Sequence, residues 1–540
     1  MLSNDYLFGD IGIDSFGFHA PRFYVKVEDL AKRRNVDPEK YRKGLLLKEM
    51  RLPDPDEDVI SIGVKAGYNA LVRGNIDPKE IDAIFVGTET VTYAVKSVSN
   101  IFAQLLNVSP NCLTQDIYNA CAGGTLATLN AIGLIEKDVI NKALVISADI
   151  SSYPLGSPSE PTQGSGAIAL VISKNPRIAK FSKKFGKVSG NINDFWRPPN
   201  DKNAHVFGHY SVDSYLKLQL DAYDNLIDCI GDFYADYYAF HAPFSKLPIK
   251  CMRQIIQKRW IHNISNLLKT KQQTLTDSLF KKLDSFLQDI IVVPEYIYFN
   301  LKERGLSSSK LEKLSNWVMS NIKTKILPHL SVPMHFGNMY NAALWSQIQY
   351  IVENYAKVND TIYFGSYGSG ATAISGLLKI KPGFRKIIEK SPKINDYITY
   401  KQRKSVQEYE LIKQGKYIPN IVIGEIQPHE FNESRGFTLH FCDEGCIIPD
   451  IDGLDRCPQG HTGFHERFFP LYAKLISEPI PLKSYDLRYL NKGLVRVEDN
   501  VHKENTLEYC IRRVKVNDED LAEKGLLNWS PYYIKCLKYS

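Results

Sequence analysis

A cysteine at a turn ahead of a helix-forming segment is the strongest nucleophile candidate in the sequence. Cys121 lies among small residues in the stretch 119–124, and the residues that follow favour a helix. The positive end of a helix dipole favours the thiolate, which is the nucleophilic form of cysteine. Small neighbours would let a thioester approach the backbone. The stretch predicts a nucleophile, and the alternative is a buried cysteine that packs as a small apolar residue.

Two further side chains could move or hold a proton. Glu89 follows the apolar run 81–86, so it would stand at the carboxyl end of a buried strand, where active sites of α/β proteins form. Partial burial would raise the pKa of Glu89 toward values useful for acid–base catalysis. His241 stands among aromatic residues and a proline, and could hydrogen-bond a substrate carbonyl or stabilise a thiolate. The alternatives are a surface or helix-capping glutamate and a hydrogen-bonded core histidine.

A glycine-rich turn at 365–370 follows a strand-like run and could point a backbone N–H group at an oxyanion. An ordinary glycine-rich β-turn is the alternative. The turn is not a phosphate-binding loop, because the spacing and the Lys-Ser/Thr ending of such loops are absent.

Strand and helix signals alternate along the first 180 residues. Such alternation predicts an α/β fold with a largely covered sheet. Signals of the same kind return, more weakly, between residues 214 and 416. The strand-like runs are 11–18, 81–86, 143–148, 167–172, 361–364 and 371–380, and the helical or mixed runs are 59–72, 98–106, 121–134, 214–228, 233–239 and 384–416.

Two regions depart from this alternation. Residues 250–321 are rich in lysine, with Leu and Ile at helical spacing, and predict a helical insertion over about 250–325. After Pro419 the strand-like runs 422–426, 437–441, 471–476 and 493–497 stand between turn residues. We therefore expect one large domain over 1–418, with halves of about 1–190 and 191–385, and a β-rich module over 419–540.

Composition narrows the class of protein. The 540 residues are 44% hydrophobic and 24% charged, as in ordinary globular proteins, and a formal charge of +7 is too mild to demand nucleic acid. Nine scattered cysteines indicate no disulfide framework. No signal peptide is visible at the N-terminus, and no apolar run approaches the ~20 residues that cross a bilayer. We expect a cytoplasmic protein with reduced thiols that binds neither membrane nor nucleic acid.

In their order along the chain, several motifs resemble the hydroxymethylglutaryl-CoA (HMG-CoA) synthase family of the thiolase superfamily. A chance match of so many ordered motifs is not credible. The matching stretches are 11–14, 36–41, 87–90, 120–124, 160–167, 194–198, 241–246, 337–340 and 366–370.

The resemblance implies a fold, an assembly and a set of residues. The fold is a duplicated, five-layered α-β-α-β-α thiolase arrangement, and the assembly is a homodimer. The catalytic set is Glu89, Cys121 and His241, with no cofactor. The implied substrate-binding set is Asp149, Thr162, Asp194, Lys246, Asn338 and Ser366. In this set Asp149 and Asp194 would order the site, Asn338 would contact the acyl group, Ser366 would lie beside the thioester, and Lys246 near the pantetheine or phosphates of CoA.

The resemblance also implies a reaction. Cys121 would take an acetyl group from acetyl-CoA, and Glu89 would remove a methyl proton from it. The carbanion would attack the ketone of acetoacetyl-CoA, polarised by His241, to give 3-hydroxy-3-methylglutaryl-CoA for mevalonate and isoprenoid synthesis. Two departures from the family pattern, Ala122 and the stretch 208–211, bear on the shape of the acyl pocket.

Two other functions stay open. Some relatives install β-branches on polyketides that are bound to an acyl-carrier protein, with the same chemistry. A non-catalytic thiolase-fold scaffold is an alternative of another class, and the intact catalytic set counts against it.

The C-terminal module holds four candidate zinc ligands, Cys442, Cys446, Cys457 and His461, with His465 as a spare. Thiolates and imidazole suit tetrahedral zinc. Three residues separate the first two cysteines, where a zinc knuckle usually has two. The module faintly resembles the zinc-ribbon/OB-fold proteins that associate with thiolase-type enzymes, and the alternative is a loop with reduced cysteines.

Overall fold

The computed structural model describes residues 7–53, 57–198, 201, 203–256, 320–390 and 392–414, and the strands of the C-terminal part. The chain divides into two compact units. One consists of Met1–Leu52 with Ile62–Glu410, and the other of Pro53–Ser61 with Leu411–Ser540. The boundaries expected from the sequence at residues 190, 385 and 418 stay predictions.

A ten-stranded mixed sheet runs through the first unit. Its first half has the order β5-β4-β6-β7-β1, in which β4 is parallel to β5 and β6 and the other pairs are antiparallel. The bounds are β1 (Phe8–His19), β4 (Ala83–Gly87), β5 (Leu113–Ile117), β6 (Lys142–Ile150) and β7 (Ser165–Lys174).

The second half of the sheet repeats the order β4-β6-β7-β1, without a counterpart of β5. It runs β12-β13-β14-β8, with β12 parallel to β13 and the following pairs antiparallel, and β9 pairs with β14. In both halves the first strand of the half lies beside its last strand, so the fold is duplicated. The bounds are β8 (Ala179–Ser182), β9 (Gly186–Ser189), β12 (Tyr237–Phe240), β13 (Thr361–Gly368) and β14 (Thr372–Ile380). An antiparallel pairing of β1 with β8 joins the two halves.

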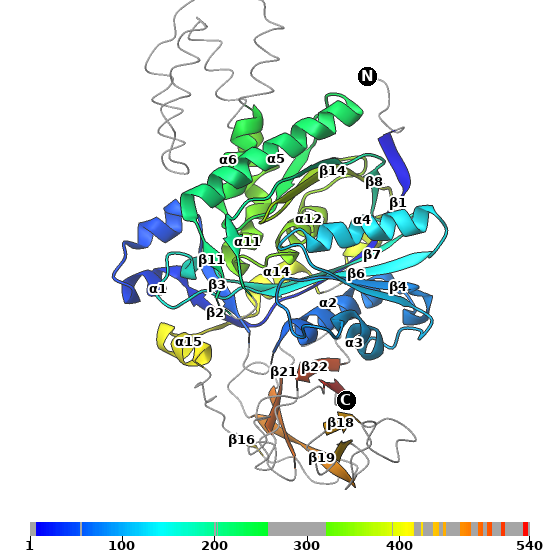
Figure 1. The fold of residues 1–540 in the computed structure, drawn as a ribbon, viewed down its shortest axis with the longest axis vertical. Coiled ribbons are helices and arrows are strands. Elements are labelled where there is room, and N and C mark those ends of the chain that lie inside the picture. The colour runs from blue at the N-terminus through cyan, green and yellow to red at the C-terminus, as the bar shows by residue number, and fades with distance from the viewer. Residues whose placement is uncertain are drawn as a thin grey trace, which may run out of the picture. The chain divides into compact units, whose positions relative to one another are not determined.

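Helices repeat in step with the strands. Figure 1 shows α2 and α3 below the first half, α4 and α12 in the middle, and α5 with α6 above β14, which makes five layers. Their bounds are α2 (Val59–Gly74), α3 (Val98–Leu105), α4 (Gly123–Glu136), α5 (Gly208–Ile230), α6 (Lys246–Ile255) and α12 (Ala342–Asn354). The expected thiolase-like α/β fold is confirmed by this arrangement and by the structural neighbours described below.

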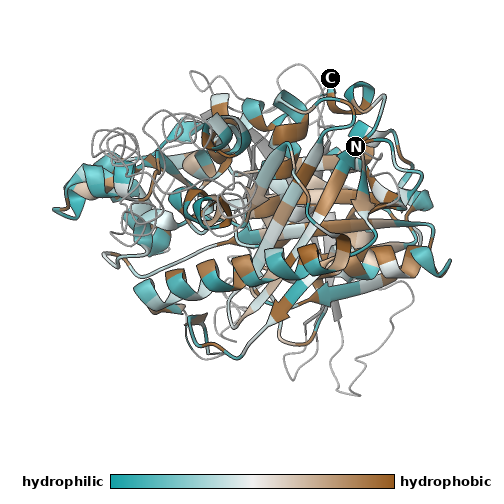
Figure 2. Cartoon of the chain, turned by 90° about the horizontal axis from the view of Figure 1, so that it is seen from above, coloured by the Kyte–Doolittle hydropathy of each residue, from teal (hydrophilic) through white to brown (hydrophobic). Residues whose placement is uncertain are grey.

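Burial follows from these layers. Every residue of β1 from Ile11 to His19 is buried, although the sequence there alternates, because β1 lies between β7 and β8 with helices on both faces. Residues 342–353 of α12 are buried on all sides for the same reason. Apolar residues accordingly gather on the strands and inner helix faces in Figure 2.

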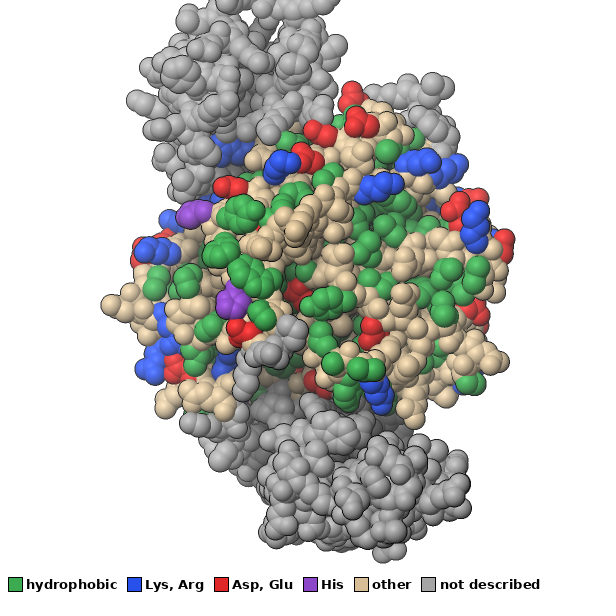
Figure 3. Space-filling view, viewed as in Figure 1, with side chains coloured by type: hydrophobic (Ala, Val, Ile, Leu, Met, Phe, Trp, Pro, Cys, Tyr) green, Lys and Arg blue, Asp and Glu red, His purple; other side chains and the backbone are tan. Residues whose placement is uncertain are grey.

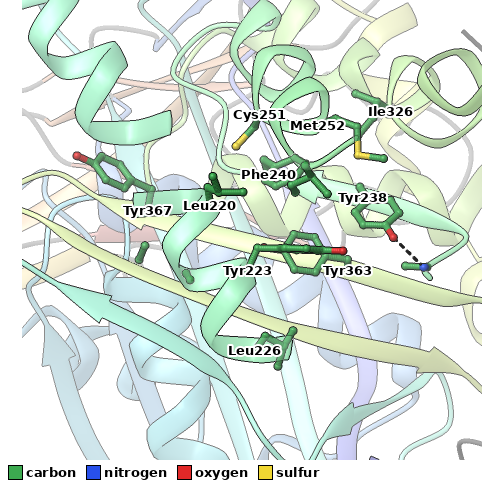
Figure 4. Packing of buried hydrophobic residues seen from close by; sticks show 14 of the residues in the cluster. Leu220, Tyr223, Leu226, Tyr238, Phe240, Cys251, Met252, Ile326, Tyr363 and Tyr367 are labelled. Carbon is green, nitrogen blue, oxygen red and sulfur yellow. Dashed lines mark hydrogen bonds between the residues drawn. The ribbon is translucent and has the colours of Figure 1, made fainter. Parts of the chain in front are cut away.

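The second half has an aromatic core. Figure 4 shows Tyr223 of α5 beside Tyr363 of β13, with Tyr238 and Phe240 of β12 close by, and their rings lie 5.4 Å or less from Tyr363. The Tyr238 hydroxyl accepts a hydrogen bond from the backbone of Ala235, which satisfies its polar end. This packing fixes the strands that end at the candidate site.

Smaller elements complete the first unit. A three-stranded sheet has the order β15-β2-β3, and a two-stranded hairpin joins β10 to β11. The bounds are β2 (Phe23–Lys26), α1 (Val27–Arg33), a π-helical turn (Lys40–Gly44), β3 (Glu49–Leu52), β10 (Phe195–Trp196), β11 (His205–Val206), α11 (Ser331–Phe336), α13 (Arg385–Ile388), α14 (Ile394–Thr399), β15 (Gln402–Arg403) and α15 (Val406–Lys413).

The sequence predicted two further helical regions, over 384–416 and over about 250–325. The single helical run expected over 384–416 is wrong: three short helices and β15 occupy it, and Pro392 cannot continue a helix. The expected helical insertion falls mostly on residues outside the described part, although residues 320–325 are helical.

The second unit contains the β-rich module. Its sheet has the order β18-β17-β19-β20-β21, with β16 beside β19, and β22 pairs with β23. The expected β-rich character is confirmed, whereas the zinc-ribbon/OB comparison stays a prediction. The bounds are β16 (Ile423–Gly424), β17 (Gly436–Phe441), β18 (Ile447–Pro449), β19 (His465–Ile476), β20 (Ser484–Tyr489), β21 (Leu494–Glu498), β22 (Tyr509–Arg513) and β23 (Tyr533–Leu537).

Among the described helices, none combines the length and the apolar character needed to span a membrane.

Candidate active site

A strained turn presents Cys121 ahead of α4. Ala120 has φ +42°, a left-handed value that is uncommon for a residue with a Cβ, and α4 begins at Gly123. The turn packs on β13: a Cβ at Gly368 would come within 2.5 Å of the Asn119 carbonyl and 2.8 Å of the Ala122 Cβ. Glycine is therefore required at 368, and β13 of the second half holds the cysteine of the first.

Glu89 reaches Cys121 from the end of β4. Both side chains are buried, and the thiol donates to the carboxylate with Sγ 3.5 Å from Oε1. Burial, and next the charge of Asp149, raise the pKa of Glu89 well above its ordinary value. Burial and the charge of Glu89 raise the pKa of Cys121 as well. Both shifts disfavour the charged forms, so burial opposes the thiolate that the helix dipole was expected to favour.

Asp149 at the end of β6 orders this pair. Its Oδ1 accepts from the backbone N–H groups of Glu89 and Thr90 and from the hydroxyls of Thr88 and Thr90, at 2.8–2.9 Å. Its Oδ2 accepts from the backbone and side chain of Asn341, at 3.0 and 2.9 Å. Asp149 thus ties the Glu89 loop to the start of α12, and both of its oxygens are occupied by protein.

Two tyrosines line the space around the nucleophile. Cys121, Tyr153 and Tyr340 form one buried cluster. The Tyr340 hydroxyl and the Asn338 amide hydrogen-bond the Tyr153 hydroxyl, and burial raises the pKa of Tyr153. Asn338 also accepts from the backbone of Tyr340 at 3.0 Å, so its side chain lies beside the tyrosines around Cys121, and its contact with an acyl group stays a prediction.

The β10–β11 hairpin also borders the space around Cys121. Phe195 packs edge-on against Tyr153 and Tyr340, with ring centroids 6.5 and 6.0 Å apart. Arg197, two residues on, donates to the backbone carbonyl of Glu89 at 3.0 Å. Trp196 is turned outward with its ring stacked on His205. The face seen in Figure 3 carries apolar side chains interspersed with charged side chains and histidines.

His241 enters from the second half of the fold. It follows β12 directly, donates its backbone N–H to Gly365 of β13 at 2.8 Å, and its carbonyl accepts from Tyr215 at 2.6 Å. Burial lowers the pKa of His241 to about 3, so the imidazole is neutral at physiological pH. Its Nδ1 is buried with no hydrogen-bond partner among the described residues.

Asp194 supports the same end of β13. Its carboxylate accepts from the Tyr367 hydroxyl at 2.6 Å and from the Gly370 backbone at 2.9 Å, and it is fully buried. Ser366, the neighbour of Tyr367, is buried in β13. Asp194 therefore holds the end of β13 through both of its oxygens, and its role in ordering the active site stays a prediction.

Two expected binding residues are engaged with the backbone. The Lys246 ammonium donates to the Lys43 carbonyl at 3.0 Å, and burial lowers its pKa. The Thr162 hydroxyl donates to Ser159 at 2.7 Å, while its carbonyl accepts from Asn338 at 2.9 Å. Thr162 thereby positions Asn338 through the backbone.

Several residues of the site were not singled out from the sequence. Arg197 and Tyr340 lay unremarked inside motifs that carried the resemblance, so a signal existed for them. Tyr367 likewise lay inside the motif 366–370, whereas Tyr153 had no signal, because only the folded chain brings it to Cys121.

No group of three or more potential metal ligands occurs among the described residues. Cys442, Cys446, Cys457 and His461 lie outside those residues, so the zinc site stays a prediction.

Comparison with known proteins agrees with the geometry. Family profiles described as hydroxymethylglutaryl-coenzyme A synthase N terminal and C terminal match residues 8–177 and 185–409. The HMG-CoA synthase of Methanocaldococcus jannaschii is 34% identical over 244 residues, which cover 44% of this chain and 70% of the relative. HMG-CoA synthase A of Dictyostelium discoideum is 29% identical over 397 residues, 71% and 78% of the two chains.

Solved structures share the fold. MvaS in complex with 3-hydroxy-3-methylglutaryl coenzyme A has a TM-score of 0.61 at 25% identity, covering 78% of this chain and 94% of its own. The curacin biosynthetic pathway HMG synthase in complex with holo donor-ACP has a TM-score of 0.61 at 22% identity, covering 76% and 88%.

The thiolase-like fold and a cysteine paired with a buried carboxylate define an acyl-transferring condensing enzyme. More narrowly, the chain belongs to the hydroxymethylglutaryl-CoA synthase family.

Proposed function

We propose that this chain condenses acetyl-CoA with acetoacetyl-CoA to 3-hydroxy-3-methylglutaryl-CoA, with Glu89, Cys121 and His241 as catalytic residues. The observation that carries the proposal is the buried hydrogen bond between the Cys121 thiol and Glu89, at the start of α4. A thiol paired with its own base is the arrangement that nucleophilic catalysis requires.

Acyl transfer begins when Glu89 takes the thiol proton. The sulfur attacks the acetyl carbonyl, the bond from that carbon to the sulfur of CoA breaks, and the proton passes to the departing CoA thiolate. Glu89 is then again a carboxylate beside acetyl-Cys121. Its raised pKa makes it a stronger base than an exposed glutamate.

Condensation uses the same carboxylate. Glu89 removes a methyl proton, and backbone N–H groups at Cys121 and near Ser366 stabilise the enolate oxygen. The enolate carbon attacks the ketone of the acetoacetyl thioester. A neutral His241 donates an N–H to the ketone oxygen, and Glu89 returns its proton to the alkoxide. Water then cleaves the bond to Cys121 and leaves a carboxylate on the product.

Mass spectrometry tests the nucleophile. After incubation with acetyl-CoA, one acetyl group should be found on a peptide that contains Cys121. The Cys121→Ser chain should carry none, because an unactivated hydroxyl is a much poorer nucleophile at neutral pH. An acetyl group on Cys112 instead would overturn the assignment.

A carrier protein is the second candidate for the acyl donor, because a structural neighbour was solved with a donor-ACP. Transfer rates to Cys121 from acetyl-CoA and from an acetylated carrier protein separate the two. A rate at least tenfold higher from the carrier protein would favour the β-branching function. The scaffold alternative fails if either donor acetylates the chain.

Assembly, location and metal content complete the proposal. We propose a cytoplasmic homodimer that needs no cofactor for catalysis and has a structural zinc in its C-terminal module. Four protein ligands would leave the zinc no open position for chemistry. Metal analysis of the chain and of a Cys442→Ser/Cys457→Ser variant checks the zinc, which should fall from about one per chain to none.

A further inference from the structure

A buried hydrogen bond holds Tyr153, one of the two tyrosines that line the space around Cys121. Tyr153 lies in the segment between β6 and β7, outside any helix or strand, and its backbone N–H donates to Gln163 Oε1 at 2.8 Å. Gln163 Nε2 in turn donates to the Tyr409 hydroxyl at 2.6 Å. All three residues are buried. Tyr409 belongs to α15, which contributes no side chain to the cluster around Cys121.

The chain of bonds continues to a buried charge. The Tyr409 hydroxyl also hydrogen-bonds Glu160, and burial followed by this carboxylate raises the pKa of Tyr409. Arg34 holds Glu160 with two bonds of 2.8 Å, and the Gly156 N–H adds a third. Glu160 is therefore fixed, and through it the hydroxyl of Tyr409 has one orientation.

The segment that contains Gln163 also positions Asn338. A Cβ at Gly337 would come within 1.9 Å of the Gln163 carbonyl, and Asn338 donates its backbone N–H to Thr162. Asn338 and Tyr153, which meet through their side chains, thus both depend on where Gln163 lies. A shift of Gln163 would move both groups relative to Cys121.

We propose that Gln163 and Tyr409 are positioning residues for the condensation step, so that α15 is part of the active-site scaffold. The inference rests on the proposed function. Removing the Tyr409 hydroxyl leaves Gln163 Nε2 and Glu160 each short of a partner in a buried place. Misplacement of a substrate-facing group by about 1 Å costs up to 10²-fold in rate.

The full-length Tyr409→Phe chain tests this. We expect kcat for condensation to fall about tenfold, with the KM for acetyl-CoA changed less than about twofold. Combined with Tyr153→Phe, the loss should be smaller than the product of the two single losses, because both changes act through one path. Tyr397→Phe is the matched control, since Tyr397 is also buried and its hydroxyl also accepts an amide bond, from Asn69. Equal kcat values for the two variants, or strictly multiplicative losses, would overturn the proposal.

Alkylation of Cys121 separates failure of this proposal from failure of the proposed function. The second-order rate with iodoacetamide, read by mass spectrometry, needs no acyl substrate. A change of at least threefold in Tyr409→Phe and none in Tyr397→Phe supports the network, even if the wild-type chain forms no HMG-CoA. Unchanged alkylation and unchanged turnover in Tyr409→Phe exclude it.

Discussion

A hydrogen bond joins Cys121 and Glu89 in a site that disfavours charge. Their pKa values are both raised by burial, and the nearby Asp149 carboxylate adds to the effect. The raised pKa of Cys121 disfavours a free thiolate, and in the wild-type site Glu89 is placed to accept the proton as the thiol reacts. This accounts for the direct contact between the two side chains.

Replacing Glu89 should separate the two half-reactions. Glu89→Ala removes a negative charge beside Cys121, which lowers the pKa of the thiol, so that the thiol can lose its proton to solvent and acetylation continues without the base. Without the carboxylate no group removes the methyl proton, so formation of the carbon–carbon bond should fall by roughly 10²–10⁴. Acetyl-enzyme by mass spectrometry and HMG-CoA by chromatography measure the two steps. Condensation near the wild-type rate would show that another group is the base.

Arg197 is the cation that acts on this base, and its removal should move the pH profile. Its positive charge lowers the pKa of Glu89, while burial, Asp149 and Cys121 set the rest of the environment. Glu89 must be ionised to accept a proton, so activity is lost as the pH falls through its pKa. In Arg197→Gln that pKa rises, and the acid limb of kcat should move up by about half to one pH unit, since the side chain is exposed and screened.

Arg197→Lys is the control for the pH profile of kcat. It keeps the positive charge, so the acid limb should stay within about 0.3 pH unit of its wild-type position. An acid limb that stays in place in both variants would mean that Arg197 does not influence Glu89.

At the level of elements, the nucleophile turn depends on a strand far along the sequence. Gly368 of β13 lies against Asn119 and Ala122, and no side chain fits between them. The residue after the nucleophile is therefore packed on β13. This small space accounts for Ala122, which the sequence had flagged only as a departure from the family pattern.

Gly368→Ala should displace this turn. The added methyl group meets backbone atoms, which cannot rotate away, so we expect acetylation of Cys121 to slow more than tenfold and the free energy of unfolding to fall by about 1–3 kcal/mol. Gly133→Ala in α4 is the matched control, because nothing lies within 4 Å of its Cβ position. It should raise stability by up to about 1 kcal/mol. Equal acetylation rates in both variants would refute the role of Gly368.

Most of these elements could be predicted, because local patterns determine them. Apolar runs marked β4, β6, β7 and β13, and the segment 371–380 became β14. The segment 384–416 misled, since its helical residues carry Pro392 and a two-residue strand beside β2. The sequence also placed Cys121, Glu89 and Asn338 in one site. It could not show that Asp149 accepts six hydrogen bonds there. Those bonds come from two segments far apart in the sequence, residues 88–90 and Asn341, and no local pattern encodes them.

For the whole molecule, duplication explains where the catalytic groups stand. Gly87 of β4 pairs with Ser147, and Phe240 of β12 pairs with Gly365, at corresponding ends of the two halves. Glu89 and His241 therefore leave equivalent strands, two residues and one residue past these pairs. Each half of the fold thus supplies one of these side chains from the same end of an equivalent strand.

An exposed edge of the sheet predicts how two copies associate. β5 pairs with β4 on one side, and among the described strands none covers its other side. Leu113 of β5 is 47% exposed, and Val95, in the loop before α3, is 97% exposed. An unpaired edge with apolar neighbours is a template for another strand, and a two-fold axis would place β5 against its own copy.

Positive charges introduced at the β5 edge should then prevent two copies of the chain from associating. The wild-type chain should sediment at twice its 61.4 kDa, and Leu113→Lys/Val95→Lys at the single mass, because like charges would face each other across the axis. Val139→Lys is the control, since Val139 is 63% exposed and follows α4 rather than β5. A double variant that still sediments as a dimer would place the interface elsewhere, and a wild-type monomer would exclude the assembly. Because β5 leads into the Cys121 turn, loss of the dimer should also lower the rate of acetylation, which sedimentation and mass spectrometry on the same samples would reveal.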